Sequence, residues 1–245
     1  MYNILSNVIK NSLIFMLIER LFMHANKYTM KHLLNDKYTK IENKNKFLTK
    51  ISENATAILH TVVALYYSYF ILVDPIFWAD RLYYTSALST QLGTITCGYF
   101  LYDTIICIRR YNTSGIAFLI HGIVCLLVNS FSLVFKIGHF HWAASIIWEL
   151  STPFVHLRSL LLKLDIKTFR KINDILLITI FFFARILCGF YFGYSFWTDV
   201  ITNDRLLRNQ SFILYHGLHI QLLLNMVMNI LNIYWFSLML KKIKL

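Results

Sequence analysis

Charged residues are scarce in this chain of 245 residues. They make up 15% of it, against roughly a quarter in an ordinary soluble domain, and only 12 residues are Asp or Glu. Proline and glycine are also few, at 2 and 8 residues, and no long linker or internal repeat is present. Hydrophobic residues reach 57% and occur in long runs. These features exclude an ordinary soluble core and favour a single-domain membrane protein with a leading helix.

Motifs of several function classes are missing as well. The cysteines, Cys97, Cys107, Cys125 and Cys188, have neither metal-ligand spacing nor a disulfide pattern, so we interpret them as small membrane-facing residues. There is no Walker loop, nucleophile elbow or zincin motif. The net charge of +12 is divided among the segments between apolar runs and forms no basic domain. The sequence therefore predicts no nucleic-acid partner, and the basic residues carry topology information instead.

Seven segments are long and apolar enough to predict membrane-spanning helices, each of which needs about 20 residues. They cover residues 3–23, 54–74, 82–106, 114–135, 140–162, 172–197 and 213–240. The first holds Lys10, Glu19 and Arg20 and lacks both a basic leader and a small-residue cleavage site, so we expect a retained anchor and no signal peptide. The predicted class is an all-α polytopic membrane protein.

Basic residues alternate between the two predicted sides of the membrane. Sixteen lie on one side: Lys27, Lys31, Lys37, Lys40, Lys44, Lys46, Lys50, Arg109, Arg110, Lys163, Lys167, Arg170, Lys171, Lys241, Lys242 and Lys244. Four lie on the other: Arg81, Lys136, Arg205 and Arg208. The positive-inside rule places the richer side, including the C-terminus, in the cytoplasm and the N-terminus outside or in the lumen. Seven spans satisfy this parity.

Ionisable residues inside these segments need an explanation, because hydrocarbon does not solvate charge. On a helix over 140–162, one face would carry Trp142, Ser145, Glu149, Thr152 and His156. Pro153 should kink this helix and free the carbonyl of Glu149. Arg158 points to the opposite side near the cytoplasmic end, where it either reaches the interface or has a buried partner.

Four other segments carry polar stripes at helical spacing. These are Thr96, Tyr99 and Asp103; His121, Cys125, Asn129 and Ser132; Asp174, Ile178, Phe181 and Arg185; and Gln221, Asn225, Asn229 and Asn232. Hydrogen bonding between helices explains the amide stripe best. For the ionisable members we predict a shared pocket formed by Asp103, His121, Glu149 and Arg185, in which Arg185 is the charge partner of Glu149.

Four histidines, His139, His141, His216 and His219, fall near the predicted lumenal side. His216 and His219 are one helical turn apart, a spacing that metal ligands use. No cysteine supports a metal site and nothing relates the two pairs, so we interpret these side chains as interfacial. The sequence predicts no metal and no cofactor.

Four motifs in order resemble the TLC (TRAM/LAG1/CLN8) domain family. They are "GYFLYDTI" (98–105), "WELSTPFVHLR" (148–158), "FFFARILCGF" (181–190) and "LNIYWFSLMLKKIK" (231–244). The resemblance implies a domain over 48–245 with six core helices around a lipid-accessible cavity, preceded by a helix and basic loop over 1–47. It also implies location in the endoplasmic reticulum or a related membrane. Asp103, Glu149, Arg158 and Arg185 match polar positions of the wider family.

The chain departs from the ceramide synthase branch of this family. That branch carries a His-His pair, where this sequence has His121 followed by Gly122. Its second motif, His-Asp followed by another Asp, is replaced by Ser145, Ile146 and Glu149. The resemblance is therefore closer to the other TLC domain-containing proteins, and ceramide synthase activity is not expected.

Three functions fit these observations. The first is a protein that binds, senses or moves membrane lipids and influences lipid composition, with lipid-pocket candidates Asp103, His121, Glu149, His156, Arg158 and Arg185. The second is a lipid acyltransferase in which His121 serves as base or nucleophile. The third is a purely structural membrane protein. Membrane lipids are the expected partners.

The topology is testable in sealed microsomes. We expect protease to remove a tag at the cytoplasmic C-terminus and glycosylation only at Asn209, because the sequons at Asn54 and Asn112 face the membrane or cytoplasm. Immunoblotting checks both outcomes. A protected C-terminal tag, or a glycan on Asn112, would contradict the predicted orientation.

Overall fold

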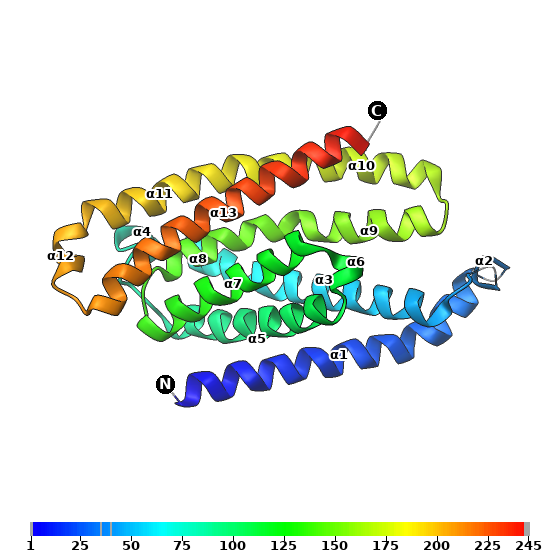
Figure 1. Cartoon of the computed structure of the whole chain (residues 1–245), viewed down its shortest axis with the longest axis horizontal. Coiled ribbons are helices and arrows are strands. Elements are labelled where there is room, and N and C mark those ends of the chain that lie inside the picture. Colours follow the sequence, from blue (N-terminus) through cyan, green and yellow to red (C-terminus); the bar gives the residue numbers. More distant parts are fainter. Residues whose placement is uncertain (1, 35, 40, 243–245) are drawn as a thin grey trace.

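The computed structural model describes residues 2–34, 36–39 and 41–242, a region that is helical with short connections and contains no strand. Seven long helical rods run back and forth (Figure 1). The uninterrupted rods are α1 (Tyr2–Leu34), α3 (Lys44–Val73), α5 (Ala87–Arg109), α7 (Ile116–Phe135) and α13 (Phe212–Lys242). The all-α class is confirmed, and each predicted segment matches one rod.

Two further rods are interrupted by irregular turns. The fifth consists of α8 (His139–Ser145), the 3₁₀ turn η1 (Ile146–Ser151) and α9 (Thr152–Lys163). The sixth consists of α10 (Lys167–Phe181), the π turn η2 (Phe182–Leu187) and α11 (Cys188–Thr202). Four short helices connect the rods: α2 (Asp36–Thr39), α4 (Pro75–Ala79), α6 (Tyr111–Ser114) and α12 (Asp204–Arg208).

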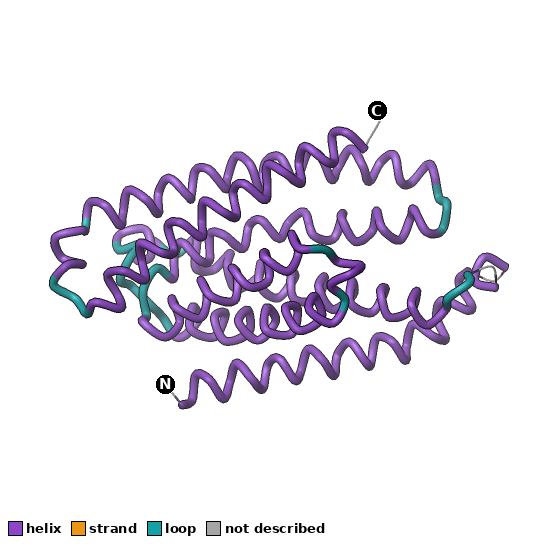
Figure 2. The backbone as a smooth tube through the Cα atoms, viewed as in Figure 1, coloured by secondary structure: helices purple, strands orange, loops and turns teal. Residues whose placement is uncertain are grey.

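The connections gather mainly at the two ends of the bundle (Figure 2). The connections that contain α2, α6 and the α9–α10 turn lie toward one end of the bundle. Those that contain α4 and α12 lie at the opposite end (Figure 1). The connections therefore alternate between the two ends of the bundle, as the distribution of basic residues predicted. The expected basic loop over 24–53 is shorter than predicted, because α1 continues to Leu34 and α3 begins at Lys44. Lys40 and Lys244 lie outside the described residues.

Four rods within the described region are long and apolar enough to cross a membrane: Lys44–Val73, Ile116–Phe135, Lys167–Thr202 and Phe212–Lys242. Only 17–39% of the residues in their most apolar windows are buried inside the bundle. Most of this apolar surface therefore faces outward, as expected when lipid surrounds the protein. The length and apolar composition of these four rods make the chain an integral, polytopic membrane protein.

The fifth rod differs from the predicted kinked helix. The sequence predicts that Pro153 leaves the carbonyl of Glu149 without a partner. In the structure, the backbone N–H of Thr152 donates to that carbonyl. The chain achieves this bond by tightening into a 3₁₀ turn just before α9, which begins with proline in its first turn. Since a 3₁₀ turn has three residues per turn, Trp148 follows Ser145 on the same face, and Glu149 turns aside.

Helix α1 packs against α5 at a glycine. A Cβ atom placed on Gly98 would lie 2.5 Å from the Cβ of Asn11 and 3.0 Å from the backbone nitrogen of Ser12. Backbone atoms cannot move aside as a flexible side chain can, so only glycine permits this approach. Val8 and Phe15 are buried on the same side of α1.

Gly98→Val tests this contact. We expect it to lower the free energy of unfolding by about 1–3 kcal/mol, because the new side chain pushes α1 away from α5. Thermal unfolding in detergent micelles measures the change. Ile108→Val, which places the same side chain at an exposed position of α5, is the control. Equal unfolding temperatures for the two variants would mean that α1 is not anchored at Gly98.

Candidate functional site

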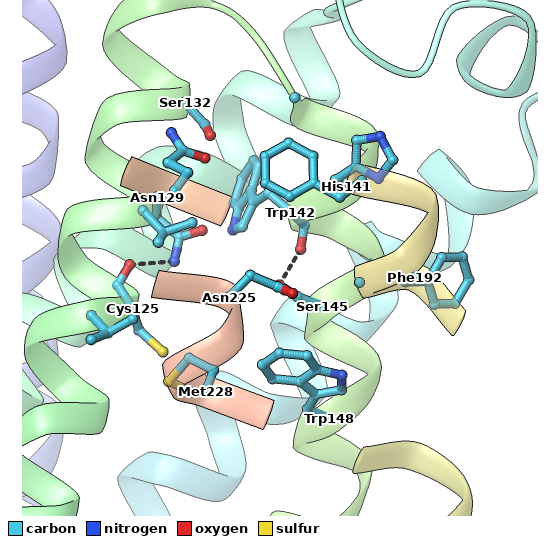
Figure 3. A pocket seen from close by; sticks show the side chains of 16 residues that line it. Cys125, Asn129, Ser132, His141, Trp142, Ser145, Trp148, Phe192, Asn225 and Met228 are labelled. Carbon is cyan, nitrogen blue, oxygen red and sulfur yellow. Dashed lines mark hydrogen bonds between the residues drawn. The ribbon is translucent and has the colours of Figure 1, made fainter. Parts of the chain in front are cut away.

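A cavity of about 70 Å³ lies inside the bundle between α7, α8, η1, α11 and α13 (Figure 3). Its wall is formed by Val124, Cys125, Val128, Asn129, Ser132, Gly138, His141, Trp142, Ser145, Trp148, Phe192, Gly193, Phe196, Gln221, Asn225 and Met228. Three of the predicted polar stripes converge here. The 3₁₀ turn contributes Trp148, which continues the face of Trp142 and Ser145.

Five polar atoms of the wall are buried and have no hydrogen-bond partner among the described residues. They are Asn129 Oδ1, His141 Nδ1, Trp142 Nε1, Trp148 Nε1 and Gln221 Nε2. A buried polar group without a partner costs about 1–3 kcal/mol. These atoms are fully buried, so they lie behind the surface of the cavity, and a guest reaches them only when the side chains of the wall rotate.

Glycine on α11 closes one wall of the cavity. A Cβ atom on Gly193 would lie 2.9 Å from Asn225 Oδ1 and 3.2 Å from Asn229 Nδ2. The absence of a side chain lets α11 approach the amide stripe of α13 closely. Within that stripe, Asn229 Nδ2 donates to Asn225 Oδ1 at 3.1 Å, and Asn232 accepts from Arg185. The amide stripe therefore links α13 to Arg185, as expected, and it also lines the cavity.

One charged cluster contacts the cavity through His141. His141 Nε2 lies 2.8 Å from Asp199 Oδ2, and Arg81 Nη2 lies 2.5 Å from Asp199 Oδ1. Arg81 already balances the charge of Asp199, so a neutral imidazole that donates from Nε2 suits this arrangement. Asp199 and Arg81 were not among the sequence candidates.

A second cluster surrounds Arg185, in the π turn. Its Nε donates to the carbonyl of Trp148 at 2.9 Å and lies 2.8 Å from Ser151 Oγ. Its Nη2 is 3.5 Å from Glu149 Oε1, so the predicted ion pair is confirmed. Thr152 Oγ1 donates to Glu149 Oε2 at 2.7 Å, which satisfies the other carboxylate oxygen.

The remaining candidates form no hydrogen bond or ion pair with Arg185, although His121 and His156 lie within electrostatic range of Glu149 and Arg185. Arg158 Nε pairs with Asp174 Oδ1 at 2.8 Å, so it has a buried partner instead of reaching the interface alone. His156 is half-buried on α9. The ring of His121 contacts the rings of Phe100 and Trp235, and its nitrogens lie 3.9 Å from Cys125 Sγ.

Asp103 lies beside Gly122, the residue that follows His121 on α7. A Cβ atom on Gly122 would be 3.3 Å from Asp103 Oδ2 and 3.0 Å from Thr104 Oγ1. A larger residue at position 122 therefore requires α5 and α7 to adjust. The six lipid-pocket candidates, Asp103, His121, Glu149, His156, Arg158 and Arg185, are all absent from the described cavity wall. The uncharged members of the same stripes form it.

The four histidines that were predicted near the lumenal side have different partners in the structure. His139 lies 2.7 Å from Ser89 Oγ and 3.1 Å from the carbonyl of Ser132, while His219 Nδ1 contacts the carbonyl of Tyr215 at 2.9 Å. His216 packs against Phe212. The described residues contain no group of three or more metal-ligating side chains.

The fold and its interior define a polytopic helical membrane bundle with a largely apolar cavity that neutral polar side chains also line. The family model of the TLC domain matches residues 50–241, and the chain belongs to this family.

Similar proteins include an uncharacterized TLC domain-containing protein of Schizosaccharomyces pombe, which is 28% identical over 86% of this chain and 70% of its own length. Another uncharacterized TLC domain-containing protein, of Saccharomyces cerevisiae, is 28% identical over 80% of the chain and 65% of its own length. The protein named topoisomerase I damage affected protein 4, also of S. cerevisiae, is 28% identical over 64% and 57%. The chain thus spans between just over half and about two thirds of the length of these relatives.

Glu149→Gln tests the pair with Arg185. The amide still accepts from Thr152, but Arg185 loses its counter-charge, so we expect the free energy of unfolding to fall by about 3 kcal/mol. The double variant with Arg185→Met should lose less than the sum of the two single variants, because the two residues act together. Denaturant unfolding in micelles measures these values.

Glu42→Gln, at an exposed position, is the matched control and should change stability by less than about 0.5 kcal/mol. If Glu149→Gln is no more destabilising than this control, the pair does not stabilise the bundle. If it spares folding but removes bound lipid, Glu149 belongs to a ligand site instead.

Proposed function

We propose that this protein binds, senses or moves membrane lipids and thereby influences the lipid composition of its membrane. The observation that carries the proposal is the cavity inside the bundle, whose wall combines a largely apolar surface with neutral polar side chains such as Asn129, Gln221 and Asn225. A structural role alone leaves this space unexplained, because packed helices fill their interior with side chains. An amphipathic guest accounts for both kinds of surface.

The position of the cavity supports a guest that comes from the bilayer. Its wall includes residues of α11 and α13, whose outer surfaces are apolar. Tyr194 on α11 is 73% exposed, and Ile220 and Leu223 on α13 are 55% and 59% exposed. Lipid acyl chains suit this outer surface and the apolar part of the cavity wall, and a headgroup suits its neutral polar side chains.

The alternatives have less support. For an acyltransferase, His121 would need a partner that activates it. Its described neighbours are two aromatic rings and the Cys125 thiol, and no described carboxylate lies within hydrogen-bond distance of it. For a structural protein, the Arg185 cluster explains why Glu149 and Arg185 are buried, but it leaves the neighbouring cavity unfilled.

The membrane in which this function operates is part of the proposal. The endoplasmic reticulum or a related endomembrane is what the resemblance to the family implies. The names of the fungal relatives state no lipid.

Lipid analysis tests the proposed function. We expect the protein purified in mild detergent to carry a reproducible set of lipids, and cells that express it to differ in membrane lipid composition from cells with an empty vector. Lipid mass spectrometry measures both. A preparation that retains only the bulk lipids in bulk proportions, from membranes of unchanged composition, would contradict the proposal. A covalent acyl group on His121 would favour the enzyme.

A further inference from the structure

Basic residues are concentrated at the end of the bundle that carries α2, α6 and the α9–α10 turn (Figure 1). The connecting segments at this end and the C-terminal segment contain the sixteen Lys and Arg residues of the richer side. The same segments contain four acidic residues, Asp36, Glu42, Glu53 and Asp165. An excess of positive charge just outside a membrane attracts anionic lipid headgroups. This end of the bundle therefore suits an anionic membrane surface.

Three of these lysines converge where α3 packs against α9. Lys163 Nζ, at the end of α9, lies 5.7 Å from the centre of the Phe47 ring on α3. Lys46 and Lys50 are one helical turn apart and therefore neighbours on the surface of α3, and Lys50 is also one turn from Phe47. The Phe47 ring is buried in a cluster of apolar side chains, which fixes the position of the three lysines around it.

The positive charge of these three lysines is only partly balanced. Among the described side chains, the carboxylate that pairs with one of them is that of Glu53, 3.7 Å from Lys50 Nζ, and Glu53 is also paired with Arg110. Burial and the neighbouring Lys50 and Lys46 lower the pKa of Lys163, which ends α9 just outside the predicted span. Like charges held together repel one another, so an anion placed among them stabilises this contact.

The surface beside these lysines suits the chains of a lipid. Leu157 and Leu162 are exposed on α9, and Lys163 follows Leu162 directly. Basic residues in such a position lie at the level of the lipid headgroups, while the apolar residues before them lie in the hydrocarbon. A bound lipid can therefore place its headgroup among the lysines and its acyl chains along the exposed leucines. A soluble anion gains nothing from this apolar surface.

The charge of the three lysines indicates the kind of headgroup. Even when Glu53 is assigned entirely to them, two positive charges remain. A phosphomonoester carries a charge of about −1.5 to −2 at neutral pH and offers three acceptor oxygens. It balances this surplus, whereas the headgroup of phosphatidylserine has a net charge of only −1. Each lysine ammonium can donate to such oxygens from several directions.

We propose that Lys46, Lys50 and Lys163 bind the phosphomonoester headgroup of an anionic phospholipid at the end of the bundle that is predicted to face the cytoplasm. This inference goes beyond the proposed function, because none of the three lysines belongs to the cavity wall and the site does not depend on what the cavity holds. The bound headgroup neutralises the lysines and stabilises the packing of α3 against α9.

Native mass spectrometry of the full chain from nanodiscs tests the inference. The nanodiscs contain dioleoylphosphatidylcholine with a small fraction of dioleoylphosphatidic acid, whose headgroup is a phosphomonoester, or of dioleoylphosphatidylserine. We expect the protein to retain phosphatidic acid in preference to phosphatidylserine. Inorganic phosphate in millimolar excess should not displace the lipid, because phosphate lacks the acyl chains that contribute to binding.

Two double variants with equal net charge locate the site. Lys46→Gln with Lys163→Gln should reduce retention of phosphatidic acid roughly twentyfold, since each lysine near an anionic surface contributes about fivefold. Lys171→Gln with Lys242→Gln, at exposed positions of α10 and α13, is the matched control and should retain phosphatidic acid nearly as the unaltered protein does. All four lysines are exposed, so both variants should fold, which thermal unfolding in micelles checks.

Equal retention of phosphatidic acid by the two double variants would overturn the inference, because net charge alone would then explain binding. Equal retention of phosphatidylserine and phosphatidic acid would exclude recognition of a phosphomonoester. Displacement by inorganic phosphate would identify a soluble anion as the ligand and exclude the lipid. A protein that carries a reproducible set of other lipids but never phosphatidic acid would refute this site while leaving the proposed function intact.

Discussion

Arg185 is buried between helices, and its guanidinium must find acceptors for five N–H groups where no lipid can supply them. The acceptors come from the carbonyl of Trp148, from Ser151 and Thr152, and from Asn232 on α13. Glu149 supplies the counter-charge. This requirement joins the fifth, sixth and seventh rods at one point, and both irregular turns, η1 and η2, occur there.

The same irregular turn determines what the cavity contains. Because η1 is tightened, Trp148 shares a face with Trp142 and Ser145, whereas Glu149 reaches Arg185. The charged groups are consequently satisfied among themselves, and the wall of the cavity next to them is largely apolar with neutral polar side chains. Asp199 has a similar role near His141, since it pairs with Arg81 and orients the imidazole. A bundle that pairs its charges around an uncharged cavity can accept a neutral guest.

Much of the fold and part of the site could be predicted from the sequence. The rods follow from apolar length, and the Glu149–Arg185 pair follows because each needed a partner at depth. The side chains that line the cavity were less predictable. Helical spacing grouped Glu149 with Trp142 and Ser145, but this grouping assumed an unbroken α-helix. Arg158 likewise had two possible environments, and only the packing of α10 brings Asp174 to it.

Composition and periodicity therefore determined a helical membrane bundle, the alternation of its basic connections and the presence of polar stripes inside it, and four sequence motifs carried its resemblance to the TLC domain. These properties depend on local sequence and on the cost of exposing polar backbone to lipid. The tertiary structure decided which members of each stripe meet. The 3₁₀ turn, the π turn and the close approach at Gly193 rotate and shift side chains by a fraction of a helical turn, and that small rotation separates a satisfied ion pair from a cavity able to bind a ligand.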